Sequence, residues 1–141
     1  MGQGVEINLT TGEVRTIVVP DAPPLTPLQE LDNARLSQKE KIAASRYAAE
    51  TAGLVVNGST VKTDRESQAM LTGAWVTVQM KPTALIDWKA ENGWTKINKA
   101  TVEALADAVS THVQACFTRE CQLSAQIDAA RTVAAVETII W

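Results

Sequence analysis

The sequence has few of the residues that form covalent cross-links, metal sites and acid–base pairs. Its 141 residues include one histidine and two cysteines, and aromatic residues make up only 4%. No apolar run approaches the roughly 18–20 residues that a membrane-spanning helix needs. The first residues show no basic segment followed by an apolar one, so a signal peptide is not expected. These absences argue against a disulfide scaffold, a zinc domain and a membrane protein, and they predict synthesis in a cytoplasm.

Small and aliphatic residues dominate what is present. Hydrophobic residues make up 45% of the chain, and alanine is abundant, which is typical of packed helices rather than of a β-sandwich. A chain of this length fits one domain with a short appendage and can bury a core without a metal or a disulfide. The net charge of −3 argues against a nucleic-acid-binding surface.

The N-terminal part reads as a β arm on a stiff spacer. Residues 5–19, "VEINLTTGEVRTIVV", alternate apolar and polar side chains on both sides of Thr11-Gly12, which predicts a β-hairpin or extended arm over residues 1–20. Four prolines follow in "PDAPPLTP", so residues 21–27 are expected to form a stiff spacer. Because an isolated hairpin is marginally stable, we expect the arm to pack on the domain or to pair with another chain.

The remaining residues, 28–141, are expected to form one α-rich domain. Its first helix has a strong start signal, with Thr26 as N-cap, Pro27 at the first helical position and Gln29 two residues later. The Ala-rich pattern continues to Ala52, and Gly53 provides the residue that ends the helix.

Residues 56–67, "VNGSTVKTDRES", allow two interpretations, a phosphate-binding loop or a hairpin followed by a capped helix. A phosphate loop needs glycine immediately before its lysine, but Val61 precedes Lys62. Asp64 and Glu66 would also bring negative charge to the helix N-terminus where a phosphate binds. The segment is therefore predicted to be structural.

The structural interpretation gives a hairpin and a second helix. Asn57-Gly58 lies between short apolar runs, which is a strong hairpin signal. Thr63 is expected to cap the following helix, and Pro82 to end it. One face of that helix is apolar and predicts core positions, including a tryptophan: Ser67, Leu71, Ala74, Trp75 and Val78.

A second hairpin and a long final helix complete the expected fold. The hairpin has its turn at Asn92-Gly93, and Asn98 caps a helix with a continuous apolar stripe: Val102, Leu105, Ala106, Val109, Val113, Cys116, Phe117, Leu123 and Ile127. Thr132 begins a short tail helix that is expected to end at Trp141. The predicted class is α+β, mainly α, with about three main helices, two of them long, joined by two short Asn-Gly hairpins, plus the N-terminal β arm.

The reactive residues are too scattered for a metal or nucleophile site. Cys116 and Cys121 lie about 140° apart around one helix, which suits neither a disulfide nor a metal clamp, so both are expected to be buried or half-buried thiols. His112 has no paired nucleophile and is expected at the surface or at the core boundary.

Glu120 interrupts the apolar stripe of the last helix. A buried unpaired carboxylate is costly, so a structural ion pair with Arg46 or Arg65 is expected, with a general base as the alternative. No acid, base or nucleophile accompanies it, so we predict no catalytic, cofactor-binding or metal-binding residues, no cofactor, and no enzyme activity.

Partner binding is predicted instead for apolar side chains of the arm and for three tryptophans on a hairpin or near the end of the sequence, where they could anchor an interface. These residues are Val5, Ile7, Leu9, Val14, Ile17, Val19, Trp88, Trp94 and Trp141.

The string "KEKIAASRYAAETAGLVVNGSTVKTDRESQAMLTGAW" resembles a domain of unknown function found in tailed bacteriophages. The likeness lies in an R-x-A-A-E core from Arg46 to Glu50, the "GLVVNG" hairpin, the T-D-R-E-S-Q segment and a W-K…N-G-W hairpin. It covers about residues 38–130, and "INLTTGEV" resembles the starts of tail-fibre and tail-fibre assembly proteins.

This resemblance implies a structural component of a bacteriophage tail, fibre- or baseplate-associated and attached through its N-terminal arm. The alternative is a tail-fibre assembly chaperone that is absent from the mature virion. Either protein would be made in the host cytoplasm, and the structural component would be located in the virion tail. The implied partners are other tail or tail-fibre proteins and further copies of the chain, with a trimer favoured, and neither nucleic acid nor membrane.

Overall fold

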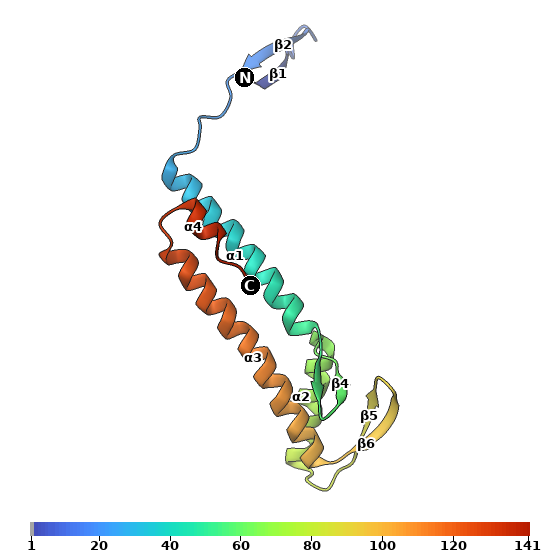
Figure 1. Ribbon diagram of the computed structural model, residues 1–141. Coiled ribbons are helices and arrows are strands. Elements are labelled where there is room, and N and C mark those ends of the chain that lie inside the picture. The colour runs from blue at the N-terminus through green and yellow to red at the C-terminus, as the bar shows by residue number, and fades with distance from the viewer. Residues whose placement is uncertain (1) are drawn as a thin grey trace. The chain divides into compact units, whose positions relative to one another are not determined.

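The computed structural model describes residues 2–141 and divides the chain into two compact units, residues 1–30 and 31–141 (Figure 1). The fold is α+β and mostly helical, which confirms the predicted class. None of the helices in the described part of the chain is long and apolar enough to cross a membrane.

The first unit is built around an antiparallel hairpin of β1 (Gly2–Ile7) and β2 (Val14–Val19). Its turn differs from the predicted one at Thr11-Gly12, because Ile7 pairs with Val14 and leaves a loop over residues 8–13. Asn8 organises this loop: its carbonyl accepts from Gly12 N at 2.7 Å, and its side chain accepts from two further backbone amides. The Asn8 side chain thus forms a wider turn than a two-residue hairpin.

Helix α1 (Pro27–Thr51) begins as predicted. Thr26 Oγ1 accepts from Gln29 N at 3.2 Å, and the Gln29 side chain accepts from Thr26 N at 2.9 Å, which is a reciprocal capping box. The helix ends two residues before Gly53, whose φ of +87° is the left-handed conformation that glycine adopts readily.

The hairpin of β3 (Leu54–Val56) and β4 (Ser59–Val61) turns at Asn57-Gly58, with φ of 49° and 80°. Positive φ at both central residues gives the tight turn that was predicted. Helix α2 (Arg65–Met80) follows, but its N-cap is Asp64 rather than Thr63. Asp64 Oδ1 accepts from Ser67 N at 3.0 Å, whereas Thr63 is buried and bonded elsewhere.

The third hairpin pairs β5 (Ile86–Ala90) with β6 (Gly93–Ile97). Ala90 pairs with Gly93, so the turn lies at Glu91 and Asn92, one residue earlier than predicted. Helix α3 (Lys99–Ala129) is capped by Asn98, as expected. Helix α4 (Val133–Glu137) is capped by Thr132 but ends before Trp141, which corrects the predicted end.

Two apolar clusters form the core of the second unit. The first contains Ala74, Val78, Ile97 and Val102, packed against Ile86, Trp88 and Leu105. The second contains Ile42, Ile127 and Val136, packed against Leu31, Ala34, Leu123, Ala130, Ile139 and Trp141. Much of the predicted stripe of α3 is buried or half-buried, but Trp75, expected in the core, is 43% exposed.

Gly53 and Gly58 both have positive φ, but only Gly53 lies close to another part of the backbone. Replacing each by alanine therefore separates the cost of a steric contact from the cost of backbone strain. Gly58→Ala meets nothing within 4 Å and is expected to cost about 1 kcal/mol for its positive φ alone. Gly53→Ala places a new Cβ 3.1 Å from the Val61 carbonyl oxygen, so it is expected to cost at least about 1 kcal/mol more. Urea denaturation of both variants measures the difference, and equal losses would contradict it.

Candidate functional site

The most elaborate polar site is centred on Glu50, near the end of α1. Its side chain is fully buried, and both carboxylate oxygens have donors. Oε1 accepts from Arg65 Nε at 2.8 Å and from Gln68 Nε2 at 3.1 Å. Oε2 accepts from Arg65 Nη2 at 3.0 Å and from Arg46 in a short ion pair. Helices α1 and α2 are thus joined by a carboxylate that the protein itself satisfies.

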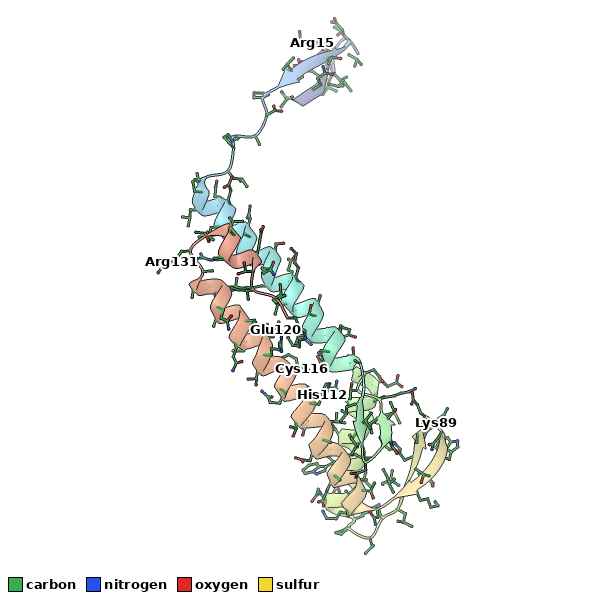
Figure 2. The ribbon with its side chains drawn as sticks, in the orientation of Figure 1. Arg15, Lys89, His112, Cys116, Glu120 and Arg131 are labelled. Atoms are coloured by element: carbon green, nitrogen blue, oxygen red, sulfur yellow. The ribbon has the colours of Figure 1, made fainter. Side chains whose placement is uncertain are left out.

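Arg46 extends this network to α3. Its Nε donates to Glu120 Oε2 at 2.7 Å, and its guanidinium lies 4.4 Å from the centroid of the Phe117 ring. The predicted ion pair of Glu120 is therefore confirmed with Arg46 as the partner. Figure 2 shows Glu120 on α3 together with Cys116 and His112. A planar guanidinium can bind two carboxylates and stack on a ring at once, which a lysine cannot do.

The balance of forces at Glu50 favours its charged form. Burial by itself opposes ionisation, but hydrogen bonds from Gln68 and Arg46 and the positive charges of Arg65 and Arg46 outweigh it and hold the pKa of Glu50 below its ordinary value. The hydrogen bond to Glu120 is the main cause of the raised pKa of Arg46. Glu50 and Arg46 are therefore both held in their charged forms.

Thr63 ties the same helices together through the backbone. Its hydroxyl donates to the Glu50 carbonyl at 2.6 Å and accepts from Gly53 N at 2.8 Å. Gln68 Nε2 also donates to the Thr63 carbonyl at 2.7 Å. The sequence predicted a cap at Thr63 and placed Glu50 and Gln68 only within segments that resemble the family. The only sign of this site in the sequence was that Glu50, Thr63 and Gln68 are polar residues within segments predicted to be structural.

The remaining reactive residues do not converge. His112 is half-buried, and its Nε2 donates to the Ala49 carbonyl at 3.0 Å, which fits the predicted boundary position. Cys116 is buried, and burial raises the pKa of its thiol. Cys121 is exposed, contrary to expectation, because it lies well around the helix from Cys116. Within residues 2–141, no three His, Cys, Asp or Glu side chains are grouped so as to hold a metal ion.

The predicted partner-binding residues of the hairpin lie on two faces. The register places Val5, Ile7 and Val14 on one face, each more than half exposed, together with Val18. Ile17 and Val19 lie on the other face, where a Val19 methyl group covers Gly4. Leu9 belongs to the exposed loop.

The three predicted tryptophans have different environments. Trp88 packs on the first apolar cluster and Trp141 on the second, with the Arg119 guanidinium 5.0 Å from the Trp141 ring. Trp94 is 73% exposed on the outer side of its hairpin, with Lys89 Nζ 5.9 Å from its ring. Trp94 therefore has the most open surface of the three.

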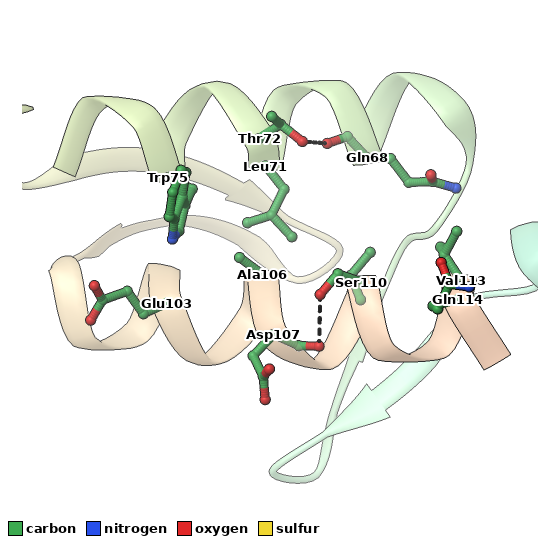
Figure 3. Close-up of a pocket in the computed structure, with 11 residues that line it drawn as sticks. Gln68, Leu71, Thr72, Trp75, Glu103, Ala106, Asp107, Ser110, Val113 and Gln114 are labelled. Atoms are coloured by element: carbon green, nitrogen blue, oxygen red, sulfur yellow. Dashed lines mark hydrogen bonds between the residues drawn. The ribbon is translucent and has the colours of Figure 1, made fainter. Parts of the chain in front are cut away.

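An open groove of about 570 Å³ lies between α2 and α3 (Figure 3). Leu71 and Val109 are buried in its floor, and Trp75 forms a wall. Its rim is polar and consists of Gln68, Thr72, Glu103, Asp107, Ser110 and Gln114. Lys99 and Gln79 donate hydrogen bonds to Glu103 and lower its pKa. The bond from Gln79 means that this carboxylate links α2 to α3.

Comparison with known proteins identifies the chain as a family member. Residues 33–140 match the family model described as a domain of unknown function, DUF4376. The chain belongs to this family. No curated protein and no solved structure matches it. The residues of the charge network all lie inside the matched region, so the network is part of the family domain.

Removing the central carboxylate should be the most damaging change in the domain. Glu50→Ala leaves Arg46 without one of its two carboxylates in a buried place, and such a loss typically costs about 3–5 kcal/mol. The matched control is Glu40→Ala, an exposed carboxylate on the same helix, for which a change within about 0.5 kcal/mol is expected. Chemical denaturation compares the two, and similar losses would contradict a central role for Glu50.

The same carboxylate predicts an acid limit to stability. Because folding lowers the pKa of Glu50 from its ordinary 4.5, its stabilisation is complete above that pH and is lost as the pH falls through the folded value. Glu50→Gln should be less stable at neutral pH but should have a shallower decline in acid. Asp64 and Glu103, whose pKa values are also lowered, supply the residual decline. Urea midpoints measured across this pH range test it, and parallel curves would contradict it.

Proposed function

We propose that the chain is a structural component of a bacteriophage tail, fibre- or baseplate-associated, attached through its N-terminal hairpin. The observation that carries the proposal is the hairpin itself. It forms a unit apart from the domain of the family, with two strands and therefore two edges whose backbone groups have no third strand within that unit. Open edges of this kind are available for strand addition by a partner chain.

The side chains of the hairpin support the same interpretation. The face that carries Val5, Ile7, Val14 and Val18 has no charged residue, while Glu6 and Arg15 form an ion pair on the opposite face at 2.8 Å. Beside open strand edges, an exposed, uncharged and mainly apolar face, which also includes Gln3 and Thr16, is the surface that a neighbouring chain would cover.

The charge network supports a structural role for the domain. Its carboxylates are held by fixed arginines, so rigidity between helices is what it provides, and no reaction is required to explain it. Taken with the resemblance to tailed-phage proteins over about residues 38–130, the proposal is a non-enzymatic module that would be located in the virion tail after synthesis in the host cytoplasm.

One observation favours a tail-fibre assembly chaperone as the second candidate. Leu25, Leu28 and Leu36 are all more than half exposed, and they lie just before or within the first part of α1. Exposed leucines near a helix start could hold an immature fibre chain and then release it.

Deleting residues 1–24 separates attachment from folding, because the deletion keeps Thr26 and its capping box. We expect the truncated protein to accumulate in the infected cell with unchanged thermal stability but to be missing from purified virions. Quantitative mass spectrometry of lysate and virions measures both. Normal incorporation of the truncated chain would overturn the arm model, and absence of the full-length chain from virions would favour the chaperone.

A point variant and its control sharpen this experiment. Val5→Asp places a charge on the uncharged face of the hairpin, whereas Thr11→Asp places the same charge in the exposed loop. The first should reduce incorporation and the second should not, since only the first is on the apolar face.

A further inference from the structure

Helix α2 has an outer face of unusual composition. Leu71, Ala74 and Val78 point into the core. Ala69, Gly73, Val76 and Met80 follow spacings of four, three and four residues, so they form one line on the opposite side of the helix. All four are exposed, including Val76 at 45% and Met80 at 76%.

Beyond Arg65, which continues this line at its N-terminal end and binds Glu50, the outer face has no charge. The sequence contains no acidic or basic residue from Ser67 to Met80. Met70, beside the outer face, is 58% exposed. The solvent-facing sides of helices in soluble proteins usually carry charged residues. A helix that is apolar toward the core and uncharged on its outer side is typical of an element covered on both sides.

Gly73, within this line, points to a close neighbour. Glycine in a helix interior is destabilising relative to alanine, and a Cβ at this position would meet nothing within 4 Å in the chain. Packing within the chain therefore does not explain the missing side chain. A second helix that crosses close to α2 at this point would explain it, because small residues let two helix backbones approach.

We propose that α2 packs antiparallel against α2 of a second copy of this chain, with the two-fold axis midway between Gly73 and Val76. This pairing sets Gly73 opposite Val76 of the second copy and Ala69 opposite its Met80. Each small residue then faces a large one, so the face is complementary to itself, as a two-fold interface requires.

The charges at the ends of α2 favour the same orientation. Glu66, in the first turn, and Lys81, just past the last turn, form no ion pair within residues 2–141. Antiparallel packing brings Glu66 of one copy near Lys81 of the other at both ends, and it also opposes the helix dipoles favourably. Parallel packing would instead place Glu66 beside Glu66 and Gly73 beside Gly73.

This interface is independent of the proposed role in a phage tail, and it differs in symmetry from the trimer that the resemblance implies. An α2–α2 contact is small for an interface, so the dimer is expected to be weak and to dissociate on dilution. The 141-residue chain can therefore be studied across its association range by sedimentation equilibrium.

Gly73→Ala separates the dimer from the stability of the monomer. At concentrations where the protein is monomeric, the variant is expected to unfold at a higher temperature, because the new methyl group meets open space. Its self-association should nevertheless weaken by roughly tenfold or more. Val76→Lys should abolish association, while the control Val55→Lys, at an exposed valine outside α2, should leave it unchanged.

Exchanging the charges of Glu66 and Lys81 tests whether the two α2 helices pack antiparallel. Glu66→Lys and Lys81→Glu should each weaken the dimer, and the double variant should restore it, because both ends then again bring opposite charges together. A protein that is monomeric at every concentration, a trimeric mass, or a dimer unaffected by Val76→Lys would overturn the proposal. Additive losses in the double variant would overturn the antiparallel arrangement.

Discussion

The second unit depends on one buried carboxylate. Glu50 is fully enclosed, and an isolated charge there would be prohibitively unfavourable, so the fold requires Arg46, Arg65 and Gln68 to stay in place around it. Through Arg46 the requirement reaches Glu120 on α3. Three helices are thus fixed to one another by geometry that few other side chains satisfy, whereas apolar contacts alone would tolerate many substitutions.

Local signals in the sequence were sufficient for most elements, because caps and turns depend on a few neighbouring residues. Thr26, Asn98 and Thr132 cap their helices as predicted, and Asn57-Gly58 turns as expected. The first hairpin has a six-residue loop instead of the predicted tight turn, and α4 ends at Glu137 rather than Trp141. Two further errors were shifts of one residue. Asp64 took the cap because Thr63 binds the end of α1, and the pairing of Ala90 with Gly93 moved a turn.

The candidate site was much less predictable, because its members meet only in three dimensions. The pairing of Glu120 with Arg46 could be anticipated from a charge within an apolar stripe. Glu50 stood out only as the end of the family-like R-x-A-A-E core, and its place in an Ala-rich helix gave no sign that it would be buried. Trp75 shows the opposite failure: its spacing matched the core face, but it lies at the edge of the α2–α3 groove and remains 43% exposed. Periodicity gives the direction of a side chain but not what covers it.

The two apolar clusters differ in how far apart their members are along the chain. The first uses residues between Ala74 and Leu105, whereas the second joins residues from Leu31 to Ile42 with residues from Leu123 to Trp141. Closing the short loops of the first loses little chain entropy, so it can assemble early, even on the ribosome. The second must wait until α4 has been synthesised. The nascent domain is therefore built from its middle outward, and the part of α1 from Leu31 to Ile42 is the last to find its partners.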